Sequence, residues 1–366
     1  MPSVHEEGGT TAMLRVLGAD DDVVDAFTSL LADAPAGTVV GRVGRVDRGR
    51  FQLLTAEGGI PISTTGVSPV CVGDWCAANS TSDTTGEADT YALLAVLPRR
   101  TALVRQSSGA RVESQALAAN IDTVMVVVPL DRPVSRRQIE RFLALAWDSG
   151  AQPVLVLTKS DLVENDTVTA ALAEVSAVSG DLSVLVVSVV TGAGMDEVAA
   201  LVQTGLTVAL LGTSGSGKST LVNALMGSEV VQTGEVREAD GKGRHTTTWR
   251  ELVVLPTGGA LIDTPGLREL GMWVDEEGIE ATFNDITDLA EQCRFNDCAH
   301  ASEPGCAVLA AIASGELASD RLDSYRKLLG EAAFAAQQND HRLAKEAQKT
   351  WKQRQSDGRR RARPRS

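Results

Sequence analysis

The sequence predicts a multidomain protein with a β-barrel first, an α/β domain next and a C-terminal α-helical domain last. Three observations support this order. Short β-type runs separated by turns fill residues 38–97, apolar strands alternate with amphipathic helices from residue 120 onward, and a Cys/His cluster lies near residue 300. At 366 residues the chain is too long for one compact core.

Composition restricts the class of protein. With 43% hydrophobic and 22% charged residues, the chain is typical of soluble globular proteins. No apolar run approaches the roughly 18 residues of a membrane span, and the first residues lack the pattern of a signal peptide. We therefore expect a cytoplasmic protein with no membrane partner.

Charge is unevenly distributed along the chain. A net charge of −14 argues against a nucleic-acid partner, because neutralising phosphates requires a basic surface. From Arg342 to the end, however, ten basic residues stand against only Glu346 and Asp357. This basic end is either a solvated, disordered tail or a segment that reaches RNA.

The segment before residue 98 predicts a small barrel of oligonucleotide-binding type, because it holds five or so short strands in sixty residues. Residues 1–35 are acidic and irregular, with one short helix predicted over 21–34. The strands are expected at Val39–Val46, Arg50–Leu54, Cys71–Val72, Trp75–Ala77 and Tyr91–Leu97.

Basic and cysteine side chains in this barrel have two interpretations each. Near the first hairpin, arginines either meet an RNA backbone or form a solvated strand edge, and both interpretations stay open. These arginines are Arg42, Arg45, Arg48 and Arg50. Cys71 and Cys76 lie within strand runs and are expected to be buried small hydrophobes instead of metal ligands.

After a linker at 99–119, strands and helices alternate. This βαβ order predicts a mostly parallel sheet with right-handed crossovers. Strands are expected at Thr123–Val128, Pro153–Leu157 and Val184–Val187, with helices over Arg136–Ser149 and Val168–Val178.

A phosphate-binding loop continues the same sheet. An apolar strand from Val208 leads into Gly212-x4-Gly217-Lys218-Ser219 and then into an amphipathic helix, the order that this motif requires. Lys218 would meet the β- and γ-phosphates and Ser219 would hold Mg²⁺, whereas the alternative is a glycine-rich turn with a surface lysine. The candidate nucleotide-binding residues of the loop are Gly212, Thr213, Ser214, Gly215, Ser216, Gly217, Lys218, Ser219 and Thr220.

The tetrapeptide Thr158, Lys159, Ser160 and Asp161 follows the second strand of the sheet, at the carboxyl end where open α/β sheets bind ligands. A carboxylate there accepts from N1–H and the exocyclic amine of guanine, whereas adenine would present an acceptor. Lys159 would lie along the base, Thr158 would tie this loop to the phosphate loop, and Ser188 would lie near the base. The alternative is an ordinary turn or helix cap.

Two further elements follow the phosphate loop. Asp263 ends a strand, where it would hold the Mg²⁺ shell through water, and the Gly266 amide would sense the γ-phosphate. Between them and the loop, the polar segment 234–248 is expected to be mobile and to supply Thr247 to Mg²⁺, with Thr246 as the second choice.

The base-reading tetrapeptide precedes the phosphate loop, which is the order of a circularly permuted GTPase. A permuted domain needs an anchor at its new exit, and four ligand-type residues follow within fourteen positions. Three thiolates and one imidazole close a tetrahedral structural zinc site with no open position. These residues are Cys293, Cys298, His300 and Cys306; the alternative is scattered core cysteines with a surface histidine.

Together these features resemble the ribosome small-subunit-dependent GTPase A family over roughly residues 38–330. The resemblance rests on Ala118–Asp122, Gly243–Thr248, Leu261–Gly266 and Glu303–Ala307. It implies a monomeric factor in late maturation of the 30S ribosomal subunit, whose GTP hydrolysis that subunit stimulates and whose barrel contacts 16S rRNA. The cofactors implied are GTP or GDP, Mg²⁺ and one structural zinc ion.

The resemblance also bears on catalysis. Leu267 occupies the position where Ras-type GTPases place a water-orienting glutamine, so intrinsic hydrolysis is expected to be slow. In this family the histidine of the Gly243–Thr248 motif is a candidate for that task, here His245, against a solvated loop histidine as the alternative. Thr158 departs from the asparagine of many members, although a threonine can still bond between loops.

The expected division of the chain has six parts: an N-terminal extension at 1–35, the barrel at 36–98, the linker, the GTPase domain at 120–285, a zinc-binding helical domain at 286–353 and a basic tail at 354–366. Two other functions compete with this interpretation. An ATP-dependent kinase or transporter would share the phosphate loop but leaves Asp161 unexplained. A non-enzymatic RNA-binding protein would sense guanine nucleotides without turnover.

Overall fold

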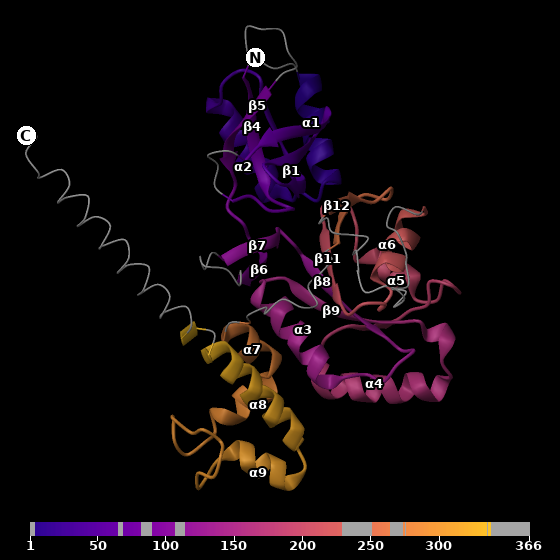
Figure 1. The fold of residues 1–366 in the computed structure, drawn as a ribbon, viewed down its shortest axis with the longest axis vertical. Coiled ribbons are helices and arrows are strands. Elements are labelled where there is room, and N and C mark those ends of the chain that lie inside the picture. Colours follow the sequence, from indigo (N-terminus) through magenta and orange to yellow (C-terminus); the bar gives the residue numbers. More distant parts are fainter. Residues whose placement is uncertain are drawn as a thin grey trace, which may run out of the picture. The chain divides into compact units, whose positions relative to one another are not determined.

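The computed structural model describes residues 4–64, 69–81, 90–106, 114–228, 251–263, 274, 276–334 and 336–337. The chain divides into two compact units (Figure 1). The first unit holds residues 1–105 and 115–272, and the second holds residues 106–114 and 273–366. Within the described residues, no helix has both the length and the apolar character needed to span a membrane.

Five strands of the first unit close into the predicted barrel. Neighbouring strands pair in the order β1 (Thr38–Asp47), β2 (Arg50–Thr55), β3 (Gly58–Ser63), β5 (Thr90–Val96) and β4 (Trp75–Thr81), and β4 returns to β1. Only the pairing of β3 with β5 is parallel. The strand predicted over 71–72 is a single bridge from Val72, and β3 was not predicted.

Two helices precede the barrel, α1 (Val4–Val16) and α2 (Asp21–Asp33). The second was predicted, and the first lies in a segment expected to be irregular. Apolar side chains at the end of α1 and along α2 are buried, and Phe27 meets the edge of Trp75 with ring centroids 6.2 Å apart. The acidic N-terminal segment is therefore part of the packed core of this unit.

Six strands continue the same sheet as the α/β domain. The order is β10-β9-β8-β11-β13-β12, and all neighbours are parallel except β13 and β12. The predicted alternation of strands and helices over 123–187 is confirmed. The strands are β8 (Thr123–Pro129), β9 (Gln152–Thr158), β10 (Val184–Val186), β11 (Thr207–Gly212), β12 (Glu251–Val254) and β13 (Ala260–Asp263).

Helices cover this parallel sheet. α3 (Arg136–Asp148) packs against β8, β9 and α4 (Asn165–Ser179), while α6 (Lys218–Met226) packs against β11 and β13. The short α5 (Met195–Ala200) also belongs to this domain. All six residues of β11 are buried, as expected for a parallel strand covered on both faces. The carboxyl ends of β8, β9, β10, β11 and β13 consequently meet at one edge.

Two strands lie in the segment expected to be a linker. β6 (Ala102–Gln106) pairs with β7 (Ser114–Ala119) in a separate two-stranded sheet. Asn120, directly after β7, connects this segment to the barrel, because its Nδ2 donates to Gly73 O at 3.0 Å. Its Oδ1 accepts from Arg100 N at 3.1 Å. The connection between barrel and α/β domain is thus itself ordered by hydrogen bonds.

Arg42 lies in β1 with no exposed surface, at a site that we call the arginine junction. Its Nε donates to Gly73 O at 3.1 Å, and its Nη2 donates to Asn120 O at 2.7 Å. Its Nη1 donates to Leu17 O and, at 2.6 Å, to Thr207 Oγ1. Both interpretations of Arg42, an RNA contact and a solvated strand edge, are therefore wrong, because its buried guanidinium joins the N-terminal segment, the barrel and the first residue of β11.

The second unit is helical. It contains α7 (Glu276–Thr282), α8 (Asn284–Ala290), α9 (Ala307–Ser314) and a further helical stretch over 319–334. Arg321, in the last helical stretch, connects it to the end of α7 and to α8 and is 7% exposed. Its Nε and Nη2 bond to the Asp285 carboxylate at 2.9 and 3.0 Å, Nη2 also donates to Thr282 O at 2.7 Å, and the guanidinium lies 4.3 Å from the ring centroid of Phe283.

Candidate functional site

The phosphate loop joins β11 to α6 at the carboxyl edge of the parallel sheet. Gly212 approaches its neighbours closely: a Cβ there would lie 2.5 Å from Val127 O and 2.9 Å from Ser216 Oγ. Gly217 has φ of 96°, a conformation that favours glycine, and it caps the start of α6. The glycine spacing predicted from the sequence therefore serves backbone geometry that other residues would strain.

Lys218 folds back over this loop. Its Nζ donates to Gly212 O at 2.7 Å and to Thr213 O at 2.8 Å, with Ser216 Oγ at 3.4 Å. The ammonium group thus lies inside the loop where a polyphosphate would be held. Ser219 follows in the first turn of α6 and is half-buried, and Thr220 is exposed.

The predicted base-reading loop lies against the phosphate loop. Thr158 ends β9 and is buried, and its Oγ1 donates to Ser216 O at 2.6 Å. A Cβ on Gly217 would also lie 3.4 Å from Thr158 Oγ1. The threonine therefore makes the bond between loops that was predicted for it.

Asp161 is oriented by the loop after the next strand. Ser188, which is buried, donates from Oγ to Asp161 Oδ1 at 2.6 Å and accepts from Thr191 N at 3.1 Å. Ser160 N donates to Val187 O at 3.2 Å, which joins the same two loops through their backbones. Residues that follow three separate strands, β9, β10 and β11, are thus brought together at this edge of the sheet, as the sequence predicted.

A fourth loop at this edge was not anticipated. It connects β8 to α3, and Lys159 Nζ pairs with its Asp131 carboxylate at 2.6 Å. Its next residue, Arg132, donates from Nη2 to Thr213 Oγ1 at 2.8 Å and to Ser214 O at 2.9 Å. The sequence could have predicted this loop, because Asp131 and Arg132 lie shortly after a strand expected in the same parallel sheet.

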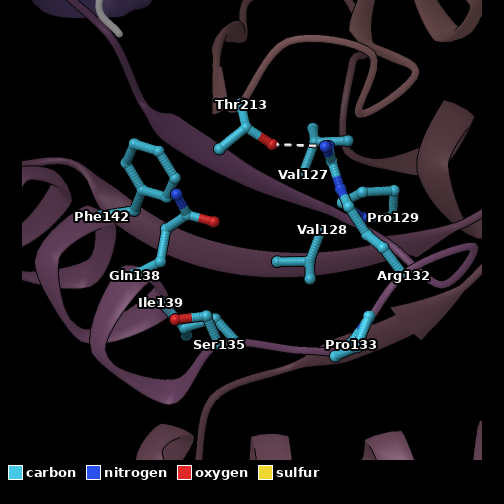
Figure 2. Close-up of a pocket in the computed structure, with 10 residues that line it drawn as sticks. All are labelled: Val127, Val128, Pro129, Arg132, Pro133, Ser135, Gln138, Ile139, Phe142 and Thr213. Carbon is cyan, nitrogen blue, oxygen red and sulfur yellow. Dashed lines mark hydrogen bonds between the residues drawn. The ribbon is translucent and has the colours of Figure 1, made fainter. Parts of the chain in front are cut away.

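Figure 2 shows Arg132 extending from this loop toward Thr213, and both residues line a cavity of about 150 Å³. The cavity is lined by the end of β8, the loop that follows, the first turns of α3 and Thr213. Ile139 forms its buried apolar wall, and Gln138 and Ser135 supply polar atoms. Arg132 therefore lies at the border between this cavity and the phosphate loop.

Asp263 is the predicted switch residue that lies within the described part of the chain. Asp263 ends β13, where its backbone pairs with Leu210 of β11 on one side and Glu251 of β12 on the other. It thus lies at the same sheet edge as the phosphate loop. His245, Thr247 and Gly266 lie outside the described residues, so their predicted roles stay predictions.

The four predicted zinc ligands converge in the helical unit, at a site that we call the cysteine cluster. The ligand atoms of Cys293, Cys298, His300 and Cys306 all lie within 4.8 Å of one another. The sulfur atoms of Cys293 and Cys306 are 3.8 Å apart, and His300 Nδ1 lies 3.6 and 3.5 Å from them. Tetrahedral zinc, with bonds of about 2.3 Å to sulfur and 2.0–2.1 Å to nitrogen, requires separations of about 3.8 and 3.6 Å. These residues therefore fit zinc.

The ligands of this cluster differ in how readily they take the form that binds a metal, and burial raises the pKa of Cys298 to about 11. Burial and the nearby Arg326 lower the pKa of His300, which keeps its imidazole neutral. Burial opposes ionisation of Cys293, but backbone N–H groups of Ala307 and Val308 offset it and lower the pKa of this thiol. Ala307 N donates to the sulfur atom of Cys293 and Leu309 N to that of Cys306, each at 3.4 Å, so backbone N–H groups at the start of α9 orient both ligands.

The chain is similar to known proteins in sequence and in fold. Residues 96–273 match the family model described as RsgA GTPase. The chain is 48% identical, over 94% of its length and 93% of the relative, to the small ribosomal subunit biogenesis GTPase RsgA of Streptomyces coelicolor. The solved structure of YjeQ from Thermotoga maritima is 28% identical with a TM-score of 0.59, covering 81% of this chain and 99% of that one.

A second solved structure supports the fold. YloQ, described as a circularly permuted GTPase, has a TM-score of 0.57 at 23% identity, covering 82% of this chain and 96% of that one. Here the strand of the base-reading tetrapeptide precedes β11 in the chain yet lies beyond β8 in the same sheet, as that permutation requires. With the near-complete coverage of a relative at 48% identity, these findings establish that the chain belongs to the RsgA GTPase family.

Proposed function

We propose that this GTPase acts on the small ribosomal subunit during its late maturation and that GTP hydrolysis times its release. The name of the Streptomyces coelicolor relative, which assigns that protein to small-subunit biogenesis, supports the proposal. The proposed setting is the cytoplasm, with the protein as a monomer. The barrel at 36–98 would contact 16S rRNA through exposed groups such as Arg48 and Arg50.

The observation that carries the nucleotide assignment is the bond from Thr158 Oγ1 to Ser216 O at 2.6 Å. It joins the loop that would recognise the base to the loop that would hold the phosphates. Asp161 would accept two hydrogen bonds from guanine, and Lys218 would exchange its bonds to Gly212 O and Thr213 O for phosphate oxygens. When bound, Mg²⁺ would supply charge neutralisation between the β- and γ-phosphates, held by Ser219 and Thr247 and, through water, by Asp263.

The timing mechanism rests on the switch residues. In the triphosphate form, the Gly266 amide and Thr247 would hold the two switch segments in the arrangement that binds the subunit. His245 would orient the attacking water, because Leu267 offers no polar group for this purpose. Loss of the γ-phosphate would release both segments and lower the affinity for the subunit.

We further propose that the cysteine cluster binds one structural zinc ion. The four ligand atoms fill a tetrahedral shell and leave no open position, which is the arrangement of structural and not catalytic zinc. The ion would fasten α8, α9 and the loop between them within the helical domain proposed for 286–353.

The decisive experiment measures GTP hydrolysis with and without purified 30S subunits, with Lys218→Ala as the blank. We expect slow intrinsic hydrolysis and a rise of about 10³-fold or more with 30S subunits. The control is the 50S subunit, which should leave the rate unchanged. Equal stimulation by both subunits, or ATP binding as tight as GTP binding, would contradict the proposal.

A second experiment tests how the base is read. In Asp161→Asn, the amide would face the exocyclic amine of guanine donor to donor, so GTP affinity should fall about 100-fold. Xanthosine triphosphate carries an oxygen at that position, and the variant should bind it in preference to GTP. Isothermal titration with both nucleotides checks this reversal, and unchanged GTP affinity would show that Asp161 does not contact the base.

A further inference from the structure

Arg132 is held rigidly beside the phosphate loop. Leu130 N donates to Thr158 O at 2.9 Å, and Asp131 pairs with Lys159 at 2.6 Å, so two bonds fix the backbone just before the arginine. Pro129 and Pro133 restrict the same segment on both sides. A long side chain on this restrained loop reaches a defined position.

That position is beside the group that would meet the β- and γ-phosphates. Lys218 Nζ donates to Thr213 O at 2.8 Å, and Arg132 Nη2 donates to Thr213 Oγ1 at the same distance of 2.8 Å. Arg132 Nη2 also contacts Ser214 O at 2.9 Å. The guanidinium and the ammonium thus both bond to one residue of the loop, and they come from segments that follow the neighbouring strands β8 and β11.

The charge of Arg132 is available to a phosphate. Both of its acceptors are neutral oxygens, so these two contacts leave the positive charge uncompensated, in contrast to Lys159 and its carboxylate partner. A guanidinium has five N–H donors, and both bonds come from Nη2. Arg132 can therefore keep its two bonds to the phosphate loop while its other N–H groups donate to an anion such as a phosphate.

We propose that Arg132 is a catalytic residue that stabilises the negative charge developing on the γ-phosphate and the β–γ bridging oxygen during hydrolysis. This inference rests on the proposed binding of GTP at the phosphate loop. It assigns to this chain a cation supplied in cis, which compensates in part for the apolar Leu267.

The step conserves atoms and charge. The oxygen of water forms a bond to the γ-phosphorus as the bond from that phosphorus to the bridging oxygen breaks. The electron pair of the broken bond stays on the β-phosphate of GDP, and the proton of the attacking water passes to the released phosphate. Arg132 donates hydrogen bonds throughout and neither gains nor loses a proton.

Three substitutions separate charge from hydrogen bonding. Arg132→Ala removes both, Arg132→Gln keeps an N–H donor on a shorter side chain without charge, and Arg132→Lys keeps the charge without the planar fork. In single-turnover assays without ribosomes, Ala and Gln should each slow hydrolysis by about tenfold to 10³-fold. Lys should recover part of the loss. The matched control is Arg136→Ala, which removes an arginine of α3 paired with Glu174 at 2.6 Å and should leave the rate unchanged.

A second measurement reports on the transition state alone. Fluorescent GDP should bind the Ala and Gln variants within about threefold of the native affinity, whereas its aluminium fluoride complex, a mimic of the transferring phosphoryl group, should bind at least about tenfold more weakly. Failure of the native protein to bind GTP would instead defeat the proposed function itself.

Two results would overturn the inference. If Arg132→Gln hydrolyses GTP at the native rate while Arg132→Ala is slow, the side chain only holds the loop. If both variants lose GDP and aluminium fluoride affinity equally, or neither changes the hydrolysis rate, the charge of Arg132 has no part in the transition state.

Discussion

The arginine junction and the cysteine cluster are both polar sites inside the protein, and they are completed in different ways. Around Arg42, a guanidinium donates to backbone oxygens and one hydroxyl from four separate segments, and its cationic group lies 4.6 Å from the ring centroid of Trp75. Around Cys306, four ligand atoms converge on one another. The arginine junction contains its own cation, the guanidinium of Arg42. The cysteine cluster consists of four metal ligands, which require a bound cation.

Because of this difference, the stability of the two sites should depend on different conditions. Burial lowers the pKa of Arg42 to about 9, which still leaves the side chain charged at pH 7. The arginine junction therefore needs no added cation. Zinc binding would contribute folding free energy directly to the second unit, so its stability should depend on metal and on the protonation of its ligands.

The largest expected effect is removal of the metal. Chelation, or Cys306→Ala, should abolish the cooperative unfolding transition of the helical unit, because structural zinc contributes about 10 kcal/mol or more to such sites. Calorimetry with and without chelator, together with zinc analysis of the purified protein, checks this. Cys71→Ala is the control, because this buried thiol lies in the other unit. Native protein purified without zinc would contradict the assignment.

Arg42→Met comes next. It fills the space but leaves the oxygens of Leu17, Gly73 and Asn120 buried without their donor, so the free energy of unfolding should fall by about 3–5 kcal/mol. Urea unfolding measures the loss, which chelator should not alter. The exposed Arg48→Met is the matched control and should cost about 0.5 kcal/mol or less. A large loss in the control would show that the surface, not the junction, is sensitive.

Arg321 tests whether the helical unit has a second, metal-independent support. Arg321→Ala should lower its stability by about 2 kcal/mol, because a largely buried charged hydrogen bond is lost. A double-mutant cycle with Asp285→Asn should give a coupling energy of about 1 kcal/mol in zinc-loaded protein. Coupling that disappears without zinc would mean that the ion pair forms only after the metal binds.

The smallest expected effect is at the nucleotide loops, which resemble the arginine junction in using only groups of the chain. Thr158→Val keeps the shape but removes the bond to Ser216 O, and GDP affinity should fall about fivefold, equivalent to about 1 kcal/mol. Thr158→Ser should restore it. The ratio of the GDP affinity of the native protein to that of Thr158→Val should be the same when the titration is repeated with chelator. A ratio that changes with chelator would contradict the independence of the two units.

Much of the α/β domain follows from the sequence because its signals are local. Apolar strands and motif spacing predicted β8, β9, β10 and the phosphate loop, and parallel pairing then brings their ends together. The cluster around Cys306 likewise follows from four residues within fourteen positions.

The failures concern features that depend on distant partners. β3 carries Gly59 and Pro61, which disfavour strands, and it forms because β2 and β5 lie on either side. Arg42 has the sequence context of a surface arginine, and its burial depends on acceptors up to 165 positions away. Arg132 is intermediate, because its place after β8 could be inferred once the sheet order was known.

The permuted order has a consequence for synthesis of the protein. β8 pairs with β11 at the centre of the sheet, and Asp122, just before β8, bonds to Thr207 N across 85 positions. At about 5–20 residues per second, the nascent chain waits roughly 4 to 17 s between these two residues. During that interval the backbone N–H and C=O groups of β8 that later pair with β11 have no strand partner, which exposes this stretch to wrong pairing until β11 is made.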